Sequence, residues 1–333
     1  MKNYILLVIA ISLDLIIGDP VTPIHPVRLI GSLILKIETL LYNTKFSKRI
    51  SGFIGVLLAL VTVVVLFTIL YRITGSFPYG KEVFSVLVFY STIAIKDLAL
   101  HGMRVKRALD KGDILLAREC AEMVLSRDVD DVSEEKIITG TVESMSENSS
   151  DSIIAPIFWG LILGPAGALA YRVINTMDAM WGYKNERFID FGRTAALLDD
   201  AVNFIPARIT GMLICLVSGF KGGFSSGLNT GFGSGLNAGN PLSTTWRIMI
   251  RDHNKTASPN AGYPEAAMAG ALGIQLGGKA SYFGKIIEKP VIGDYIKDPE
   301  TRDISKSLRI ITVAVILFIF TTGISIALKK TGS

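Results

Sequence analysis

The sequence has few of the residues that build disulfide scaffolds and metal sites. It contains two cysteines, Cys120 and Cys215, which lie far apart and form no CxxC motif. It contains three histidines, His25, His101 and His253, and no HExxH or similar pair. These absences argue against a disulfide-stapled fold, a zinc site and cysteine chemistry.

Charged residues are also scarce. They make up 19% of the 333 residues, against roughly 25% in a typical globular chain. Half of the residues are hydrophobic, and the mean hydropathy is +0.45. The formal net charge is +5, but the basic residues are scattered among the acids and form no tract. This composition favours a membrane protein and gives no reason to expect nucleic acid as a partner.

The usual nucleotide-binding motifs are missing. No GxGxxG follows an expected strand. Residues 273–279 match the letters of GxxxxGK, but Ala280 stands where a P-loop needs Ser or Thr, and no strand is expected before it. A nucleotide is therefore expected to bind through some other arrangement.

Two uncharged apolar runs, 52–71 and 310–328, are long enough to cross a bilayer, which takes about 20 residues of helix. Two shorter runs, 4–17 and 83–95, are also interpreted as spans. The first of these contains Asp14, which is by default a functional candidate because a polar group inside a membrane is costly. We therefore expect an all-α, polytopic integral membrane protein.

Two further apolar runs, 153–171 and 204–220, contain proline, glycine or arginine. Positive charges gather between the first two apolar runs, which predicts that this segment and residues 96–152 are cytoplasmic. If 153–171 then crossed the membrane, the polar motifs on its two sides would face opposite compartments. We therefore interpret both runs as re-entrant or buried apolar helices, with the helical catalytic region facing the cytoplasm.

The predicted organisation is a single membrane-embedded domain over residues 1–333. Residues 1–95 would form N-terminal membrane helices, 96–309 a helical catalytic region, and 310–328 the C-terminal transmembrane helix. The glycine-rich stretch 219–240 is interpreted as a mobile loop without direct chemistry or, alternatively, as a lid or phosphate-contacting loop.

Local signals predict two helix starts within the region 96–152. Asp113 is expected to be the N-cap of one helix, and Asp131 or Ser133 that of a second.

The stretch TVESMSENSSDS places Glu143, Glu147 and Asp151 at i, i+4 and i+8. On a helix these three carboxylates would line one face. Like charges at that spacing are destabilising unless a cation lies opposite, and Mg2+ with phosphate oxygens is the candidate. The alternative is a solvated acidic face. We favour the metal site because an apolar run follows immediately.

Residues 175–208 interleave acids that could hold a metal with bases that could hold phosphate or carboxylate. The alternative is a surface helix with i, i+4 ion pairs, but its amides and glycines would make a poor helix by themselves. The candidates are Asp178, Asp199, Asp200, Lys184, Arg187, Arg193 and Arg208.

Residues 251–265 form a turn-rich loop before an Ala/Gly-rich run, AAMAGALGIQLGG, that is expected to be helical. Pro264 near the helix start leaves Glu265 in the first turn, where exposed N–H groups suit an anion. Asn260 and Glu265 are therefore candidates for the substrate or phosphate site. His101 and His253 are candidate general bases, with structural hydrogen bonding as the alternative.

Several segments, taken in order, resemble the adenosylcobinamide-phosphate synthases of cobalamin biosynthesis. The resemblance covers nearly the whole chain, and the glycine-rich stretch departs from it. The segments that carry it are DLIIGDP with HPVRLIG (14–31), LSRDVDD (125–131), TVESMSENSSDSIIAPIFW (141–159), GPAGALAYRVINTMDAMWGYKNERFIDFGR (164–193), LDDAVNFIPAR (198–208) and SPNAGYPEAAMAGALGIQLGG (258–278).

The resemblance implies a multi-pass enzyme of the cell membrane, with ATP as co-substrate and Mg2+ as cofactor. Its reaction would be the amide ligation of an amino alcohol phosphate, (R)-1-amino-2-propanol phosphate or ethanolamine phosphate, to the free propionate of adenosylcobyric acid. A carboxylate does not react with an amine directly, so an acyl phosphate is the simplest activated form. A homo-oligomer, or an association with other corrin-pathway enzymes, is left open.

On this interpretation the candidate residues divide by role. The metal candidates are Glu143, Glu147, Asp151, Asp178, Asp199 and Asp200. The candidates for substrate and phosphate binding are Arg28, Arg127, Lys184, Arg187, Arg193, Arg208, Asn260 and Glu265. The catalytic candidates are His101, Glu147 and Asp178.

Two other classes of protein are weighed against the enzyme. A transporter would need several full-length spans with ionisable residues inside them, whereas most polar motifs here lie between the apolar runs. A non-catalytic scaffold for corrin enzymes would have little use for so many clusters of acids, amides and bases.

Overall fold

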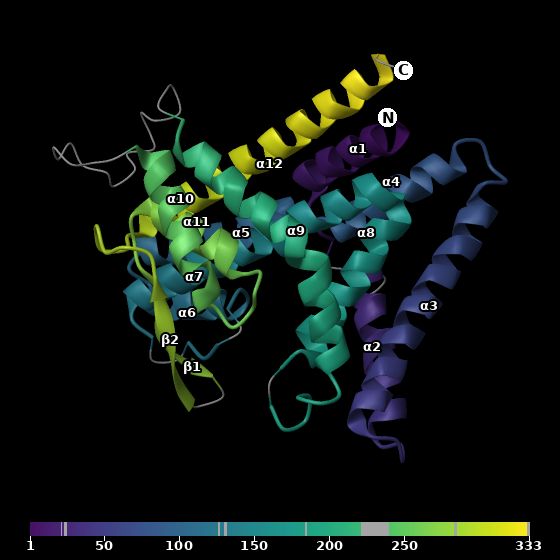
Figure 1. Ribbon diagram of the computed structural model, residues 1–333, viewed down its shortest axis with the longest axis horizontal. Coiled ribbons are helices and arrows are strands. Elements are labelled where there is room, and N and C mark those ends of the chain that lie inside the picture. The colour runs from purple at the N-terminus through teal and green to yellow at the C-terminus, as the bar shows by residue number, and fades with distance from the viewer. Residues whose placement is uncertain are drawn as a thin grey trace. The chain divides into compact units, whose positions relative to one another are not determined.

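The protein is an all-α polytopic membrane protein with one short β-hairpin in the part that the computed structural model describes (Figure 1). The description covers residues 1–333 except 21, 23, 24, 126, 130, 131, 184, 221–239, 283, 284, 332 and 333. Most of the glycine-rich stretch, together with Lys184 and Asp131, therefore lies outside the described residues.

The chain forms two compact units, and neither is a continuous stretch of sequence. Unit 1 contains Met1–Lys96 and Asp151–Asn203, and unit 2 contains Asp97–Ser150 and Phe204–Ser333. Residues 151–203 of the predicted catalytic region pack with the N-terminal helices. The predicted organisation as a single membrane-embedded domain stays a prediction.

Unit 1 is built around a long helix, α8, which packs against all four N-terminal helices. Its core contains Trp181 and Phe191, whose rings meet edge to face with centroids 5.1 Å apart. Gly52 lies directly against the backbone of Phe191, so a side chain there would collide with it. The helices are α1 (Lys2–Ile17), α2 (Pro26–Tyr42), α3 (Lys48–Thr74), α4 (Gly80–Thr92), α8 (Ala155–Trp181) and the first part of α9 (Arg193–Ser218).

Asp14, which the sequence marked as a functional candidate, has a structural role in unit 1. Its side chain is 1% exposed, and Oδ2 accepts hydrogen bonds from the backbone N–H groups of Ile95 (2.9 Å) and Lys96 (3.0 Å). These are the first residues of α5 (Ile95–Asp110), which follows a break after α4. Asp14 thus supplies from α1 the cap that α5 lacks locally.

Unit 2 packs its helices around α7, which contacts α6, α11 and α12. The predicted N-caps are confirmed: Asp113 accepts from Leu116 N (3.0 Å), and Ser133 accepts from Lys136 N (3.4 Å). The elements are most of α5, α6 (Ile114–Glu122), α7 (Glu134–Ser149), the rest of α9, α10 (Pro241–Asp252), the 3-10 helix η2 (His253–Lys255), α11 (Gly262–Leu272), β1 (Leu276–Tyr282), β2 (Lys285–Ile292) and α12 (Thr301–Thr331).

The run AAMAGALGIQLGG was expected to be helical, but only its first part is. Helix α11 ends at Leu272, where Gly273 adopts a left-handed conformation (φ 67°) that favours glycine. The chain then enters β1, which pairs with β2 in an antiparallel hairpin. The GxxxxGK letters therefore join a helix to a strand, the reverse of the order that a P-loop requires.

The chain from α7 into α8 is continuous but irregular. A π-helix, η1 (Ser150–Ile154), follows α7. Within α8 the backbone breaks at Gly164 (φ 71°), immediately before Pro165. A proline removes a helical hydrogen bond and glycine tolerates the positive φ, which together account for the kink.

Among the residues that the structure describes, five helical stretches are long and apolar enough to cross a membrane. The predicted spans 52–71 and 310–328 fall in two of them, whereas α1, which holds 4–17, is not among them. Runs 153–171 and 204–220 also lie in such stretches, so their re-entrant or buried character stays a prediction. The five are Lys48–Thr74, Gly80–Asp110, Glu134–Trp181, Arg193–Ser218 and Thr301–Lys329.

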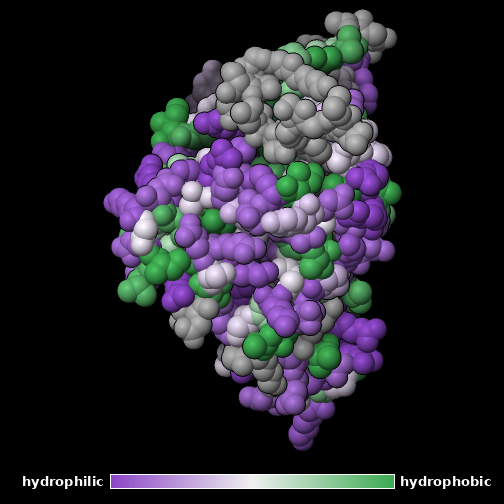
Figure 2. Space-filling model, turned by 90° about the vertical axis from the view of Figure 1, so that its left-hand side faces the viewer, coloured by the Kyte–Doolittle hydropathy of each residue, from purple (hydrophilic) through white to green (hydrophobic). Residues whose placement is uncertain are grey.

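The side of the molecule on which Figure 1 draws the hairpin is mostly hydrophilic, with hydrophobic residues in separate patches (Figure 2). By contrast, α3 exposes large apolar side chains along its length, among them Phe53, Leu57, Leu66 and Ile73. A row of this kind suits lipid contact.

Candidate functional site

Unit 2 brings three glutamates together, which we call the glutamate cluster: Glu143 and Glu147 on α7, and Glu265 in the first turn of α11. The charges of Glu143 and Glu147 both act on Glu265. Asp151, the third member of the predicted acidic face, lies in the π-helix that follows α7, where the α-helical period ends, and its role as a metal ligand stays a prediction.

Cationic and backbone donors hold Glu143. Arg127 lies 3.3 Å from one carboxylate oxygen in a pair whose side chains are 7% and 13% exposed, and the backbone N–H of Gly277 donates to the other oxygen. Lys136 fixes the same strand by donating to the Gly277 carbonyl (3.0 Å). The Arg127 guanidinium passes so close to Gly140 that any side chain there would overlap it. The site therefore combines acids with fixed cations.

Glu265 lies in the first turn of α11, as predicted. Burial, and then the charges of Glu147 and Glu143, raise the pKa of Glu265 well above its usual range, and the nearby cations Lys289 and Arg127 oppose this rise. Its role in the substrate or phosphate site stays a prediction.

Arg208 and Asn260 were both predicted as ligand-binding residues, and unit 2 places them together. Arg208 donates to Asn260 Oδ1 (3.3 Å), and its guanidinium lies over the rings of Phe204 (3.4 Å) and Tyr263 (4.3 Å). The His253 ring stacks on Tyr263 with centroids 4.3 Å apart. These contacts order the Arg208 side chain by cation–π packing.

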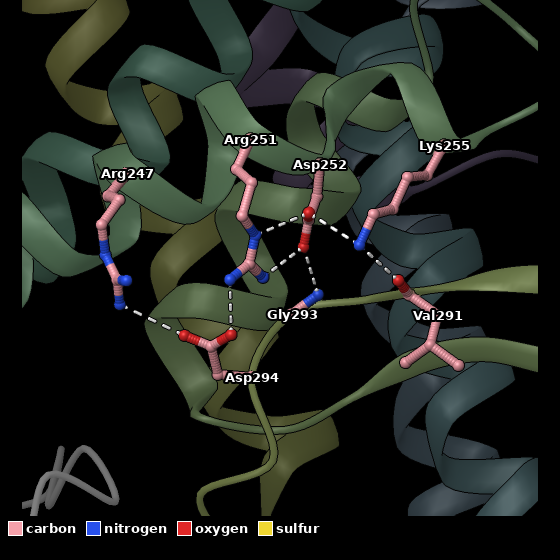
Figure 3. Close-up of polar contacts among 7 residues, drawn as sticks. All are labelled: Arg247, Arg251, Asp252, Lys255, Val291, Gly293 and Asp294. Atoms are coloured by element: carbon pink, nitrogen blue, oxygen red, sulfur yellow. Dashed lines mark hydrogen bonds and ion pairs between the residues drawn. The ribbon is translucent and has the colours of Figure 1, made fainter.

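A network of ion pairs fixes the loop after the hairpin (Figure 3). Asp252 is fully buried and accepts from Arg251 (2.7 and 2.8 Å), Lys255 (2.8 Å) and the backbone N–H of Gly293 (2.8 Å). Arg251 also binds Asp294 (2.7 Å). Burial alone would raise the pKa of Asp252, but these donors outweigh it and hold the pKa well below its usual range.

Unit 1 gathers the other acids into an aspartate cluster: Asp178 on α8, and Asp199 and Asp200 on α9. Asp178 and Asp200 both interact electrostatically with Asp199. Asn203 donates to Asp199 Oδ2 (3.0 Å), and Asn175 is a second amide neighbour. The constellation predicted in 175–208 is thus assembled in part, around acids and amides.

Two further predicted residues, Arg187 and His101, have other partners. Arg187 pairs with the buried Glu38 (2.6 Å), which also accepts from Trp181 Nε1 (3.0 Å). His101 is held by Asp97, whose carbonyl and carboxylate oxygens lie 2.9 and 3.3 Å from Nδ1. Arg28 and Arg193 are exposed near the starts of α2 and α9, and Lys184 lies outside the described residues.

Sequence reasoning missed Arg172 and Lys136. Arg172 lies in α8 beside Tyr171, and its Nη1 donates to Asn175 Oδ1 (3.4 Å). An arginine at the end of an apolar run is a signal that could have found it. No comparable local signal marks Lys136, because its target, the Gly277 carbonyl, is remote in sequence.

In the described part of the chain, no three His, Cys, Asp or Glu side chains are grouped so that they could hold a metal ion by themselves. This finding does not exclude Mg2+ at the predicted ligands, because Mg2+ commonly takes one or two carboxylates and completes its shell with water and phosphate oxygens.

Comparison with known proteins identifies the family. The model of the CobD/Cbib protein family matches residues 7–311. The chain belongs to the CobD/CbiB family. It is 39% identical to the cobalamin biosynthesis protein CobD of Desulfotalea psychrophila, over 93% of this chain and 94% of that one. The proteins of the same name from Clostridium tetani (37%; 95% and 96%) and Clostridium perfringens (40%; 92% of each) are similar. No solved structure matches the chain.

Proposed function

We propose that this CobD/CbiB family member joins an amino alcohol phosphate to the free propionate of adenosylcobyric acid in an ATP-dependent ligation that gives adenosylcobinamide phosphate. The observation that carries the proposal is the family match over residues 7–311, with relatives named cobalamin biosynthesis protein CobD. The cell membrane, with the site facing the cytoplasm where ATP is available, is part of the proposal.

The glutamate cluster has the chemistry that carboxylate activation needs. In that step a propionate oxygen bonds to the γ-phosphorus of ATP, and ADP leaves. Arg127, fixed by Glu143, would position phosphate oxygens and oppose their charge. Amide formation then expels phosphate, and a base such as His101 or one of the acids takes the proton of the amine.

The same cluster fits a divalent cation. Glu143 and Glu147 contribute two carboxylates, and burial followed by their charges raises the pKa of Glu265 well above its usual range. These two glutamates would hold Mg2+, which when bound would neutralise charge on the transferred phosphate.

The test is to incubate the purified protein with adenosylcobyric acid, ATP and Mg2+, and to follow the product by mass spectrometry. Four amines are compared: aminopropanol and ethanolamine, each free and phosphorylated. We expect a strong preference for the phosphorylated forms because phosphate offers a charged, directional contact. The methyl group that distinguishes aminopropanol from ethanolamine contributes at most roughly 1 to 3 kcal/mol to discrimination between them.

Reactions without ATP are the control for nonenzymatic coupling. Absence of amide product with all four amines, or equal product without ATP, would contradict the proposed function. Equal kcat/KM for free and phosphorylated aminopropanol would be compatible with the proposed ligation but would contradict recognition of the phosphate group.

A further inference from the structure

An acceptor and a donor in unit 1 are buried without a hydrogen-bond partner among the described residues. The acceptor is Oδ1 of Asp199 on α9, and the donor is Nε of Arg172 on α8. An unsatisfied buried polar group destabilises the folded state. Native structures rarely keep such groups without a reason, and a ligand that satisfies both atoms would supply one.

A buried chain of hydrogen bonds fixes the direction of Asp199, which is 9% exposed. Tyr171 Oη donates to Asn203 Oδ1 (2.8 Å), and Asn203 Nδ2 donates to Asp199 Oδ2 (3.0 Å). Tyr171 and Asn203 are 2% and 1% exposed, so neither can turn away freely. This chain holds one carboxylate oxygen of Asp199 and leaves Oδ1 for a ligand.

The surroundings of Asp199 suit a cationic group such as an ammonium group. Asp178 and Asp200 add negative charge around it. The amides of Asn203 and Asn175 also adjoin it, and amide oxygens can accept from an N–H donor. An ammonium group has three donors that reach acceptors spread around it at ordinary hydrogen-bond distances.

Arg172 supplies a positive group beside Asn175. Its Nη1 donates to Asn175 Oδ1 (3.4 Å), and Asn175 is also an amide neighbour of Asp199. The same amide therefore adjoins the residue with the unpartnered donor and the residue with the unpartnered acceptor. A guanidinium suits the oxygens of phosphate or carboxylate.

We propose that α8 and α9 of unit 1 form a site for a small zwitterion, with Asp199 at its ammonium end and Arg172 at its anionic end. Tyr171 and Asn203 act as positioning residues for Asp199. The identification of this zwitterion with the amino alcohol phosphate rests on the proposed function, whereas the existence of the site does not.

The test is calorimetric binding of ethanolamine phosphate to the full-length protein, with and without Mg2+ and a non-hydrolysable ATP analogue. Two analogues each lack one charge: 2-hydroxyethyl phosphate lacks the ammonium group, and ethanolamine lacks the phosphate. We expect the zwitterion to bind at least about tenfold more tightly than either analogue, because each end makes a charge-assisted contact.

The variants should remove this selectivity one end at a time. Asp199→Asn should weaken the binding of ethanolamine phosphate about tenfold and leave the binding of 2-hydroxyethyl phosphate unchanged. Arg172→Gln should also weaken the binding of ethanolamine phosphate, but should leave the binding of free ethanolamine unchanged. Tyr171→Phe keeps every charge and should give a smaller loss with the pattern of Asp199→Asn. The matched controls are Asp190→Asn and Arg49→Gln, which neutralise an exposed ion pair (2.7 Å) in the same unit and should change nothing.

An absence of zwitterion selectivity in the wild type would overturn the site, as would equal weakening of both phosphates by Asp199→Asn. If Asp199→Asn does not fold, Tyr171→Phe carries the same comparison. Amide synthesis without this selectivity would refute the site and leave the proposed function standing. Selectivity without amide synthesis would support the site and contradict the proposed function.

Discussion

The two units surround their acidic residues differently. In unit 2, Glu143 is paired with Arg127, and Asp252 is held by Arg251 and Lys255. In unit 1, Asp199 has acids and amides as neighbours, and one of its oxygens has no partner among the described residues. Acids mixed with cations suit a metal with phosphates, whereas acids among amides suit an organic cation. From residue type alone, the acids of both units would be assigned the same role, metal binding.

Unit 1 also shows that a buried acid inside an apolar helix need not bind a ligand. The carboxylate of Asp14 caps α5, and that of Glu38 accepts from Trp181 and Arg187. Their buried charge is satisfied by protein donors. The difference from Asp199 lies in hydrogen-bond partners and not in burial.

The largest expected effect is that of Glu147→Gln, which should abolish amide synthesis and leave the protein folded in the membrane. Removing this charge weakens the proposed Mg2+ site and relieves repulsion on Glu265, so stability should not fall. Turnover is measured by mass spectrometry over a range of Mg2+ concentrations, with Glu119→Gln on exposed α6 as the control. Near-normal turnover at limiting Mg2+ would remove Glu147 from the metal site.

A large effect on stability is expected for Asp252→Asn. Breaking a buried ion pair costs about 3 to 5 kcal/mol, whereas Asp294→Asn, in a more exposed pair, should cost less than about 1 kcal/mol. Because the folded pKa of Asp252 is depressed, its contribution is complete above the ordinary aspartate pKa and is lost as pH falls below it. Thermal unfolding at neutral and acidic pH measures both effects. Equal losses in the two variants would contradict this account of the network.

Asp14→Ala should destabilise unit 1 by about 1 to 2 kcal/mol, the usual worth of a helix cap. Asp14→Asn retains a carbonyl oxygen for Ile95 N and Lys96 N, so it should lose less. Thermal unfolding measures stability, and the calorimetric assay measures ethanolamine phosphate binding. A selective loss of zwitterion affinity in Asp14→Asn, without a loss of stability, would instead make Asp14 part of a ligand site.

The smallest effect is expected for Glu265→Gln. Because the folded pKa of Glu265 is raised, the group favours the folded state at low pH, and this contribution is lost as pH rises through the raised pKa. The variant should therefore have a slightly higher Tm than wild type at pH 8, and a smaller difference at pH 5. A lower Tm at pH 8 would show that the Glu265 carboxylate is stabilised by its neighbours instead of strained by them.

The sequence predicted features that depend on local patterns. The apolar length of 52–71 and 310–328 and the capping residues Asp113 and Ser133 each act over a few residues, and the structure bears them out. The i, i+4 spacing likewise placed Glu143 beside Glu147 on one helix.

Features set by distant contacts could not be predicted in the same way. The π-helix interrupts the α-helical period at Asp151, and Glu265 approaches Glu143 and Glu147 from a remote segment. The unpartnered atoms of Asp199 and Arg172 depend on the packing of α8 beside α9. A single sequence carries the charges of these residues but not the partners that decide their roles.

The most direct test of this division between the units measures two ligands on the same preparations of Glu147→Gln and Asp199→Asn. The ligands are the Mg2+ complex of a non-hydrolysable ATP analogue and ethanolamine phosphate. The account predicts that Glu147→Gln loses the nucleotide and retains the zwitterion, and that Asp199→Asn shows the opposite pattern. Loss of both ligands in each folded variant, or the reversed pattern, would contradict it.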